Sequence, residues 1–158
     1  MKVMWWEKTV EYQFVLDTSK RRSGGLLTPF DGNHEQAGDA IFADTSNRWL
    51  LIEFKRDERQ LDSEVIKFHD YRLAADELGA DDAHHQLAFG LLDSESKLTL
   101  AFCTYFSRQA IEGIESALNL GTTHAILKAY VARLIELKRG PGGGDGPGGA
   151  APQSFELF

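Results

Sequence analysis

The chain has 158 residues, of which 42% are hydrophobic and 26% charged, and its formal net charge is −7. This length favours one domain that buries most of its apolar surface. No stretch approaches the roughly 20 apolar residues of a membrane span, and the first residues lack the apolar core of a signal peptide. With the single Cys103, which excludes an intramolecular disulfide, these features predict a cytoplasmic protein with no membrane partner.

In chain order, the first predicted element is a helix over residues 4–16, where Trp6, Val10 and Phe14 recur at helical spacing. Alternating apolar patterns predict strands over residues 26–30, 38–43, 48–55, 86–92 and 98–106. Capping residues and apolar periodicity predict further helices over about 62–78, 107–120 and 124–138. The alternation of helices and strands indicates an α/β domain.

Two clusters fall in predicted loops. Lys20, Arg21 and Arg22 follow the first helix, where they either contact a phosphate backbone or form an ordinary charged loop. His84 and His85 have no His or Cys partners at zinc-site spacing, which favours loop residues over metal ligands.

The strand over residues 48–55 carries an acid and a lysine two positions apart. Because side chains alternate across a strand, Glu53 and Lys55 share one face. Asp39 begins the preceding strand, and a hairpin would bring it near Glu53. Neighbouring carboxylates raise each other's pKa unless a cation lies between them, and such oxygen ligands suit Mg²⁺ or Mn²⁺. The three residues therefore predict a metal site with a lysine that stabilises developing negative charge.

This arrangement resembles the PD-(D/E)xK nuclease superfamily. Gly38-Asp39-Ala40-Ile41-Phe42 matches the element with the single acid, with Gly where Pro is usual, and Ile52-Glu53-Phe54-Lys55 matches the acid–x–lysine element. The resemblance covers roughly residues 5–106. It implies a restriction-endonuclease-like α/β fold with an αβββαβ core, a mixed central sheet flanked by helices, and extra C-terminal helices.

The resemblance also implies a function, namely Mg²⁺- or Mn²⁺-dependent hydrolysis of DNA. Asp39 and Glu53 would bind the metal ion, and Lys55 would orient the attacking water. In many members an acid on the first helix joins the site. Glu11 is preferred for that role, because it lies deeper in the helix and closer in sequence to the site, and Glu7 is the alternative.

Other residues lie near these motifs. His34 and Glu35 precede Asp39 and are candidates for the same metal, although no motif position requires them. Glu64 and Lys67 belong to the next predicted helix, which in the superfamily often lines the site, so a supporting role is a hypothesis for Lys67. The alternative function is a non-catalytic interaction or regulatory module on the same fold. Because many small nucleases of this superfamily dimerise, a homodimer is a further expectation.

The C-terminal part has a different composition. Residues 140–152 are almost entirely Gly, Pro and Ala, which predicts a flexible linker. The predicted organisation is therefore a nuclease-like domain at 1–139, the linker, and a docking peptide at 153–158.

The docking peptide resembles the short peptides by which bacterial replication and repair proteins bind the sliding clamp. Phe155, Leu157 and Phe158 match the apolar positions, whereas Ser154 stands where Gln is usual. DNA and a bacterial sliding clamp are thus the predicted partners. Docking would raise the local concentration of DNA at the site, which offsets the weak intrinsic affinity of an acidic protein.

Overall fold

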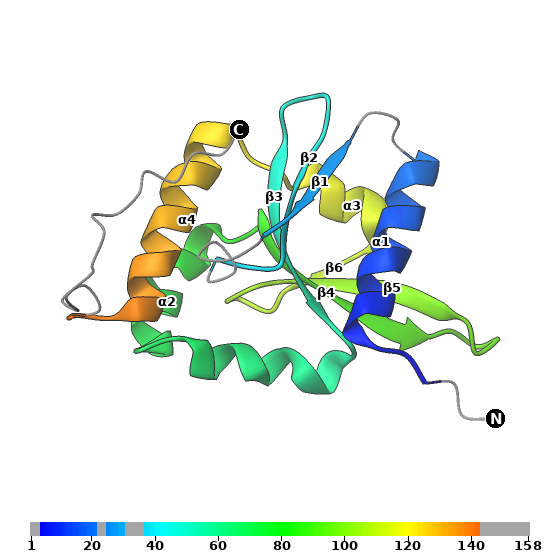
Figure 1. Cartoon of the computed structure of the whole chain (residues 1–158), viewed down its shortest axis with the longest axis horizontal. Coiled ribbons are helices and arrows are strands. Elements are labelled where there is room, and N and C mark those ends of the chain that lie inside the picture. Colours follow the sequence, from blue (N-terminus) through cyan, green and yellow to red (C-terminus); the bar gives the residue numbers. More distant parts are fainter. Residues whose placement is uncertain (1–3, 22–24, 31–36, 143–158) are drawn as a thin grey trace.

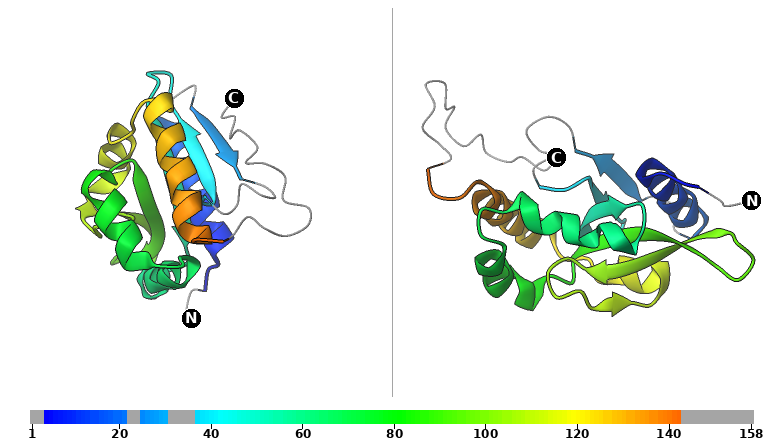
Figure 2. Two further views of the ribbon diagram at one scale, coloured as in Figure 1. Left: turned by 90° about the vertical axis from the view of Figure 1, so that its left-hand side faces the viewer. Right: turned by 90° about the horizontal axis from the view of Figure 1, so that it is seen from below.

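A computed structural model of the chain describes residues 4–21, 25–30 and 37–142. In this part, a six-stranded sheet has the strand order β1-β2-β3-β4-β5-β6, and helices lie on both of its faces (Figure 1, Figure 2). The strands are β1 (Leu26–Pro29), β2 (Ala40–Ala43), β3 (Trp49–Lys55), β4 (His85–Leu92), β5 (Leu98–Thr104) and β6 (Ala110–Ile111). The helical segments are α1 (Glu7–Arg21), η2 (Glu58–Lys67), α2 (Tyr71–Leu78), η3 (Gly79–Asp81), α3 (Gly113–Asn119) and α4 (His124–Arg139). None of these helices is long and apolar enough to cross a membrane.

The sheet is mixed. Strands β3 and β4 pair in parallel, whereas every other neighbouring pair is antiparallel. A parallel pair needs a crossover connection, and η2, α2 and η3 supply it between β3 and β4. The prediction of a mixed sheet flanked by helices, in the order helix, three strands, helical crossover and strand, is therefore confirmed at this level.

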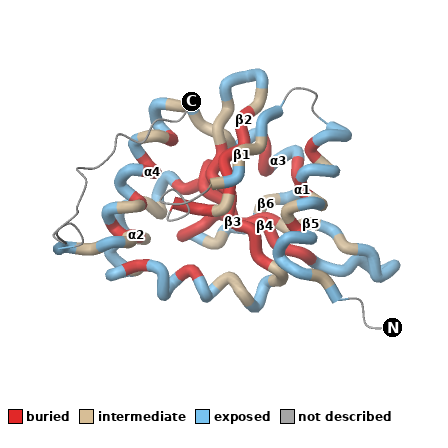
Figure 3. Tube along the Cα trace, viewed as in Figure 1, coloured by how far each residue is buried: buried red, intermediate tan, exposed pale blue. Residues whose placement is uncertain are grey.

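Two apolar cores lie on opposite faces of the sheet, and the alternation of side chains along β3 separates them. Leu50, Ile52 and Phe54 belong to the core under α1 and α3. Leu51 belongs to the core under α2 and α4. The buried residues follow the sheet in Figure 3, and the outer sides of the helices are exposed.

Helix α1 covers the first of these cores through Val10 and Phe14, and the buried Thr18 continues the same spacing. The Phe14 ring meets the ring of Phe54 edge-on at 5.6 Å between centroids. Trp6 was predicted to share this apolar stripe, and that prediction is wrong, because 64% of its surface is exposed. The helix begins at Glu7, so Trp6 precedes it and lies at the rim of a pocket.

The single helix predicted over residues 62–78 is instead two segments. A 3₁₀ helix, η2, ends where the extended residue Phe68 turns its ring into the core. A new helix, α2, then starts at Asp70, whose side chain accepts a hydrogen bond from the Leu73 backbone N–H at 3.0 Å. Burial of the Phe68 side chain and the Asp70 cap therefore interrupt the predicted helix.

The prediction of a helix over residues 107–120 is also wrong for its first residues, because α3 begins only at Gly113. The Ser107 backbone N–H and hydroxyl both donate to the Asp82 carboxylate, at 2.8 Å each, so this serine holds a tertiary contact instead of capping a helix. The chain then pairs as β6 with β5, and α3 begins only at Gly113. A long-range hydrogen bond has here replaced the local cap that the sequence indicated.

Of the two clusters predicted in loops, Lys20, Arg21 and His85 lie in regular structure, whereas His84 lies in a turn. Lys20 and Arg21 form the last turn of α1, where Arg21 lies 3.7 Å from Glu115. His84 and His85 are buried, and His85 opens β4 with its Nδ1 2.8 Å from the Tyr130 hydroxyl. The loop prediction is therefore wrong for His85, which belongs to a strand.

Several predictions fall on residues outside the described ranges. These are Arg22, His34, Glu35, most of the 140–152 linker, and the docking peptide with Phe155, Leu157 and Phe158.

Candidate active site

Asp39 lies at the point where the β2–β3 pairing stops. The last register pair joins Ala40 to Ile52, so β3 extends beyond its neighbour. The Asp39 carboxylate accepts a hydrogen bond from the Phe54 backbone N–H at 2.6 Å, and thus occupies the place of a missing strand partner. Gly38 permits this approach, because a Cβ there would come within 3.0 Å of the Leu51 side chain.

Glu53 and Lys55 project from this same end of β3 toward the crossover helices. Both are buried, with 1% and 6% of their surface exposed, although charged side chains are almost never buried without partners. One oxygen of Glu53, Oε1, accepts from the Lys67 ammonium at 2.9 Å. Its other oxygen, Oε2, is buried and has no hydrogen-bond partner within the described part of the chain.

Glu64, from η2, joins the two lysines of the site. Its carboxylate lies 2.5 Å from the Lys55 ammonium and 2.8 Å from that of Lys67, and it accepts from the Tyr105 hydroxyl at 2.7 Å. Glu53, Lys55, Glu64 and Lys67 therefore form one connected group, called the acid–lysine cluster below. The supporting position proposed for Lys67 agrees with these contacts.

The surroundings of the cluster shift the pKa values of its two carboxyl groups in opposite directions. Burial raises the pKa of Glu53 to about 8, and the neighbouring charges of Asp39 and Glu64 add to that increase. Burial would also raise the pKa of Glu64, but Lys67 and the hydrogen bond from Lys55 outweigh it and lower the pKa to about 2. Because divergent values of this kind recur at functional sites, the cluster is a candidate active site.

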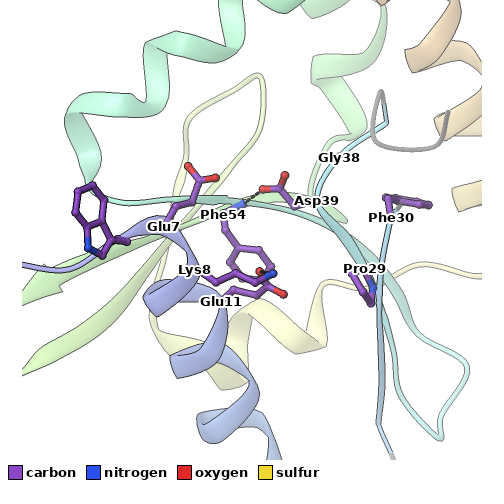
Figure 4. Close-up of a pocket in the computed structure, with 9 residues that line it drawn as sticks. Glu7, Lys8, Glu11, Pro29, Phe30, Gly38, Asp39 and Phe54 are labelled. Carbon is purple, nitrogen blue, oxygen red and sulfur yellow. Dashed lines mark hydrogen bonds and ion pairs between the residues drawn. The ribbon is translucent and has the colours of Figure 1, made fainter. Parts of the chain in front are cut away.

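A pocket of about 650 Å³ opens beside Asp39. The first two turns of α1 form one wall, with Glu7, Lys8 and Glu11, and the start of the β2–β3 hairpin forms another (Figure 4). A substrate in this pocket would contact Asp39 directly.

The two acids on α1 differ in their surroundings. Glu11 is ion-paired with Lys8 at 2.6 Å, and Figure 4 shows both side chains together on one side of the pocket. The Glu7 carboxyl lies on the same side as that of Asp39 (Figure 4). Burial raises the pKa of Glu7, Lys55 opposes this change, and Asp39 adds to it. Glu7 is therefore the α1 acid that interacts with the predicted site residues, although Glu11 was the preferred candidate.

Whether the site suits a divalent metal ion depends on the carboxylates of Asp39, Glu53 and Glu7. The described residues contain no group of three or more His, Cys, Asp or Glu side chains arranged to hold a metal ion. The donor chemistry nevertheless fits, because the buried Glu53 Oε2 has no partner and the Asp39 charge is close enough to raise the Glu53 pKa. A cation between two such carboxylates would relieve their repulsion. Asp39 and Glu53, with Glu7, are the residues that could hold it.

Two residues near the site had no functional assignment from the sequence. Tyr105 follows β5, and its hydroxyl donates to Glu64. Lys138 lies in the last turn of α4, where Glu53, Glu64 and Asp39 all contribute to its electrostatic environment. A lysine near a helix C-terminus is ordinary in a sequence, so no local pattern indicated its position.

Comparisons with family models, with curated proteins and with solved structures each gave no match to this chain.

Proposed function

We propose that the protein is a metal-dependent nuclease that hydrolyses phosphodiester bonds in DNA. The observation that carries this proposal is that Asp39, Glu53 and Lys55 lie at the end of β3 that extends beyond β2. Asp39 reaches that end through its bond to Phe54 N–H, and Glu53 and Lys55 share its buried face. The mixed sheet and the order of its elements also support a restriction-endonuclease-like core.

The side chains divide the chemistry between them. Asp39 and Glu53 would hold Mg²⁺ or Mn²⁺, with Glu7 or Glu11 as a further acid. When bound, the ion supplies charge stabilisation at the scissile phosphate and a more acidic water. Lys55 orients the attacking water and stabilises negative charge on the phosphate.

Glu64 keeps the Lys55 ammonium in place. The two groups are 2.5 Å apart, and the Tyr105 hydroxyl fixes the Glu64 carboxylate from the opposite side at 2.7 Å. A lysine held in this way loses little further freedom when it meets a substrate. The pocket beside Asp39 would admit a phosphodiester to that carboxylate, whereas Glu53 and Lys55 are not among the residues that line it.

Recruitment to DNA belongs to the same proposal. A net charge of −7 gives little of the phosphate neutralisation on which non-specific DNA binding depends. Docking of Phe155, Leu157 and Phe158 on a bacterial sliding clamp would supply this affinity through a tether. This part of the proposal rests on the sequence alone.

The decisive experiment is a cleavage assay with Mg²⁺ and Mn²⁺ on duplex, single-stranded and branched DNA and on RNA, with and without a bacterial sliding clamp. We expect Lys55→Ala to lower the cleavage rate at least about 100-fold, the typical effect of removing one electrostatic group. Lys128→Ala, which removes a lysine from α4 outside the cluster, is the matched control. Absence of metal-dependent cleavage by the wild type under all these conditions would contradict the proposal.

A second function is a non-catalytic interaction or regulatory module. The observation that favours it is that Lys67 already binds both Glu53 and Glu64, so the chain supplies its own cation to the acids. Calorimetric titration separates the two functions. Binding of Mn²⁺ that is lost in Asp39→Asn and Glu53→Gln supports the nuclease, and absence of binding supports the module.

A further inference from the structure

Lys138 reaches the site from α4, the last helix described. Its ammonium lies 5.4 Å from the centre of the Phe68 ring and 5.9 Å from that of Tyr105. Within the described part of the chain it donates one hydrogen bond, to the Ala37 carbonyl at 3.4 Å. Each of these partners adjoins a site residue, since Ala37 precedes Asp39 by two positions, Phe68 follows Lys67, and Tyr105 binds Glu64.

The end of α4 is fixed in this position. Gly140 closes the helix with a positive φ of 72°, and its backbone N–H donates to the Glu136 carbonyl. A Cβ at Gly140 would come within 2.5 Å of the His69 ring. Only glycine suits both the backbone conformation and the close contact, and this contact holds the last turn, with Lys138, against the segment that joins η2 to α2.

The partners of Lys138 differ from those of the other lysines in the site. Lys55 and Lys67 each form an ion pair with Glu64. Lys138 has no carboxylate within ion-pair distance among residues 4–21, 25–30 and 37–142. An ammonium has three donors, and the two aromatic rings stabilise its charge without accepting a conventional hydrogen bond. Two donors are therefore available to an incoming acceptor.

The surroundings of Lys138 act on its charge in opposite directions. Burial and the neighbouring Lys67 lower the pKa of Lys138 below its usual value, and the negative charges of Glu53, Glu64 and Asp39 oppose that change only in part. A cation in this position therefore interacts with the same carboxylates that would hold the metal ion.

We propose that Lys138 binds a phosphate group of the nucleic-acid substrate beside Asp39, Glu53 and Lys55. This inference rests on the proposed function, because it places the phosphate at that site. The ammonium donates to a non-bridging phosphate oxygen, for which its two remaining donors are suited. Lys138 is thus a binding residue, distinct from Lys55, and its contribution is to affinity and position.

The test measures DNA binding by the full chain in EDTA, where the metal-dependent reaction does not proceed. Fluorescence anisotropy with a labelled duplex oligonucleotide gives the affinity at several salt concentrations for wild type, Lys138→Met and Lys128→Met. The control removes an equal charge from the same helix, ten residues earlier and about 15 Å away along the axis.

We expect Lys138→Met to weaken binding at least about fivefold and to reduce the slope of log K against log salt by about 0.9, the value for one lost phosphate contact. Lys128→Met should change neither quantity, and Lys138→Arg, which keeps the charge, should retain the wild-type slope. A purely structural role would lower the folded fraction and leave the slope of the folded molecules unchanged.

An equal slope for Lys138→Met and wild type overturns the inference. The cleavage assay with Lys55→Ala separates this failure from that of the proposed function. If cleavage depends on Lys55 but the salt slope is unchanged in Lys138→Met, only the proposed role of Lys138 is overturned and the proposed function stands. A wild-type protein that neither binds nor cleaves overturns both.

Discussion

The two faces of β3 are buried to the same extent but differ in chemistry. On the face toward α1 and α3, Leu50, Ile52 and Phe54 are each 1% exposed and contact apolar neighbours. On the face toward the crossover, Glu53 is equally buried, yet it binds the charged Lys67. Burial of apolar groups stabilises a fold, whereas a buried ion pair often contributes no more than the apolar residues that would fit its place. The first face therefore contributes mainly to stability, and the second carries the residues on which the proposed function depends.

The largest effect is expected from the apolar face. Phe14 packs against the rings of Phe42, Phe54 and Phe102, and Phe14→Ala should lower the free energy of unfolding by about 3–5 kcal/mol, since it leaves a cavity. Urea denaturation measures this change. Mn²⁺ binding by the molecules that stay folded should match the wild type, and a selective loss of metal affinity would contradict the separation of the two faces.

The next effect concerns the acid–lysine cluster. Glu64→Ala removes the partner of both Lys55 and Lys67 and should cost about 3 kcal/mol, because a buried cation loses its counter-charge while the partly exposed Lys67 regains water. Glu64→Gln keeps the shape and the acceptor for Tyr105 but also removes the charge, so it should retain most of this cost. A Glu64→Gln midpoint equal to that of the wild type would show that the charge of Glu64 has no part in stability.

A smaller effect is expected at Tyr105. Tyr105→Phe removes the hydroxyl that donates to the buried Glu64 carboxylate and should cost about 1.5–2 kcal/mol, the usual contribution of a hydrogen bond to a charged group. Tyr71→Phe is the matched control, because Tyr71 packs by its ring against Phe68 and no hydrogen bond of its hydroxyl is found in the described part of the chain. If both variants lose the same stability in thermal unfolding, the hydrogen bond from the Tyr105 hydroxyl to Glu64 does not contribute to stability.

The last effect is a dependence on pH, which is limited for each single pH unit. Because the pKa of Glu53 is raised from 4.5 to about 8, the folded state binds this proton more tightly than the unfolded state does. The stability from the protonated group is complete below about pH 4.5 and is lost as pH rises toward 8. Glu53→Gln should reduce this decline by at most about 1.4 kcal/mol per pH unit, the limit for one proton. Urea denaturation at pH 5, 6, 7 and 8 measures the slope, and parallel curves for variant and wild type would refute the assignment.

Much of the fold follows from local sequence patterns. The alternation along residues 48–55 predicted that Leu50, Ile52 and Phe54 share one face and that Glu53 and Lys55 share the other, and the two cores confirm it. Thr123 and Gly140 likewise bound the last helix as expected. These signals succeed because strand alternation and helix capping depend on residues close together in the chain.

The errors arise where distant residues compete with a local signal. Ser107 binds the side chain of Asp82 in place of capping a helix, and Phe68 leaves the helical path to enter the core. His85 is buried against Tyr130, 45 positions away. In each case a tertiary contact determined the local conformation.

The sequence by itself therefore determined the alternation of β3, and with it the shared face of Glu53 and Lys55, since this needs only the two-residue period of a strand. Only the tertiary structure decided which charges surround that face. Glu64 from η2, Tyr105 after β5 and Lys138 from α4 meet there, because the parallel β3–β4 pair brings the crossover and the last helix onto one side of the sheet. The packing of apolar faces brings these residues together, and their spacing in the sequence does not predict it.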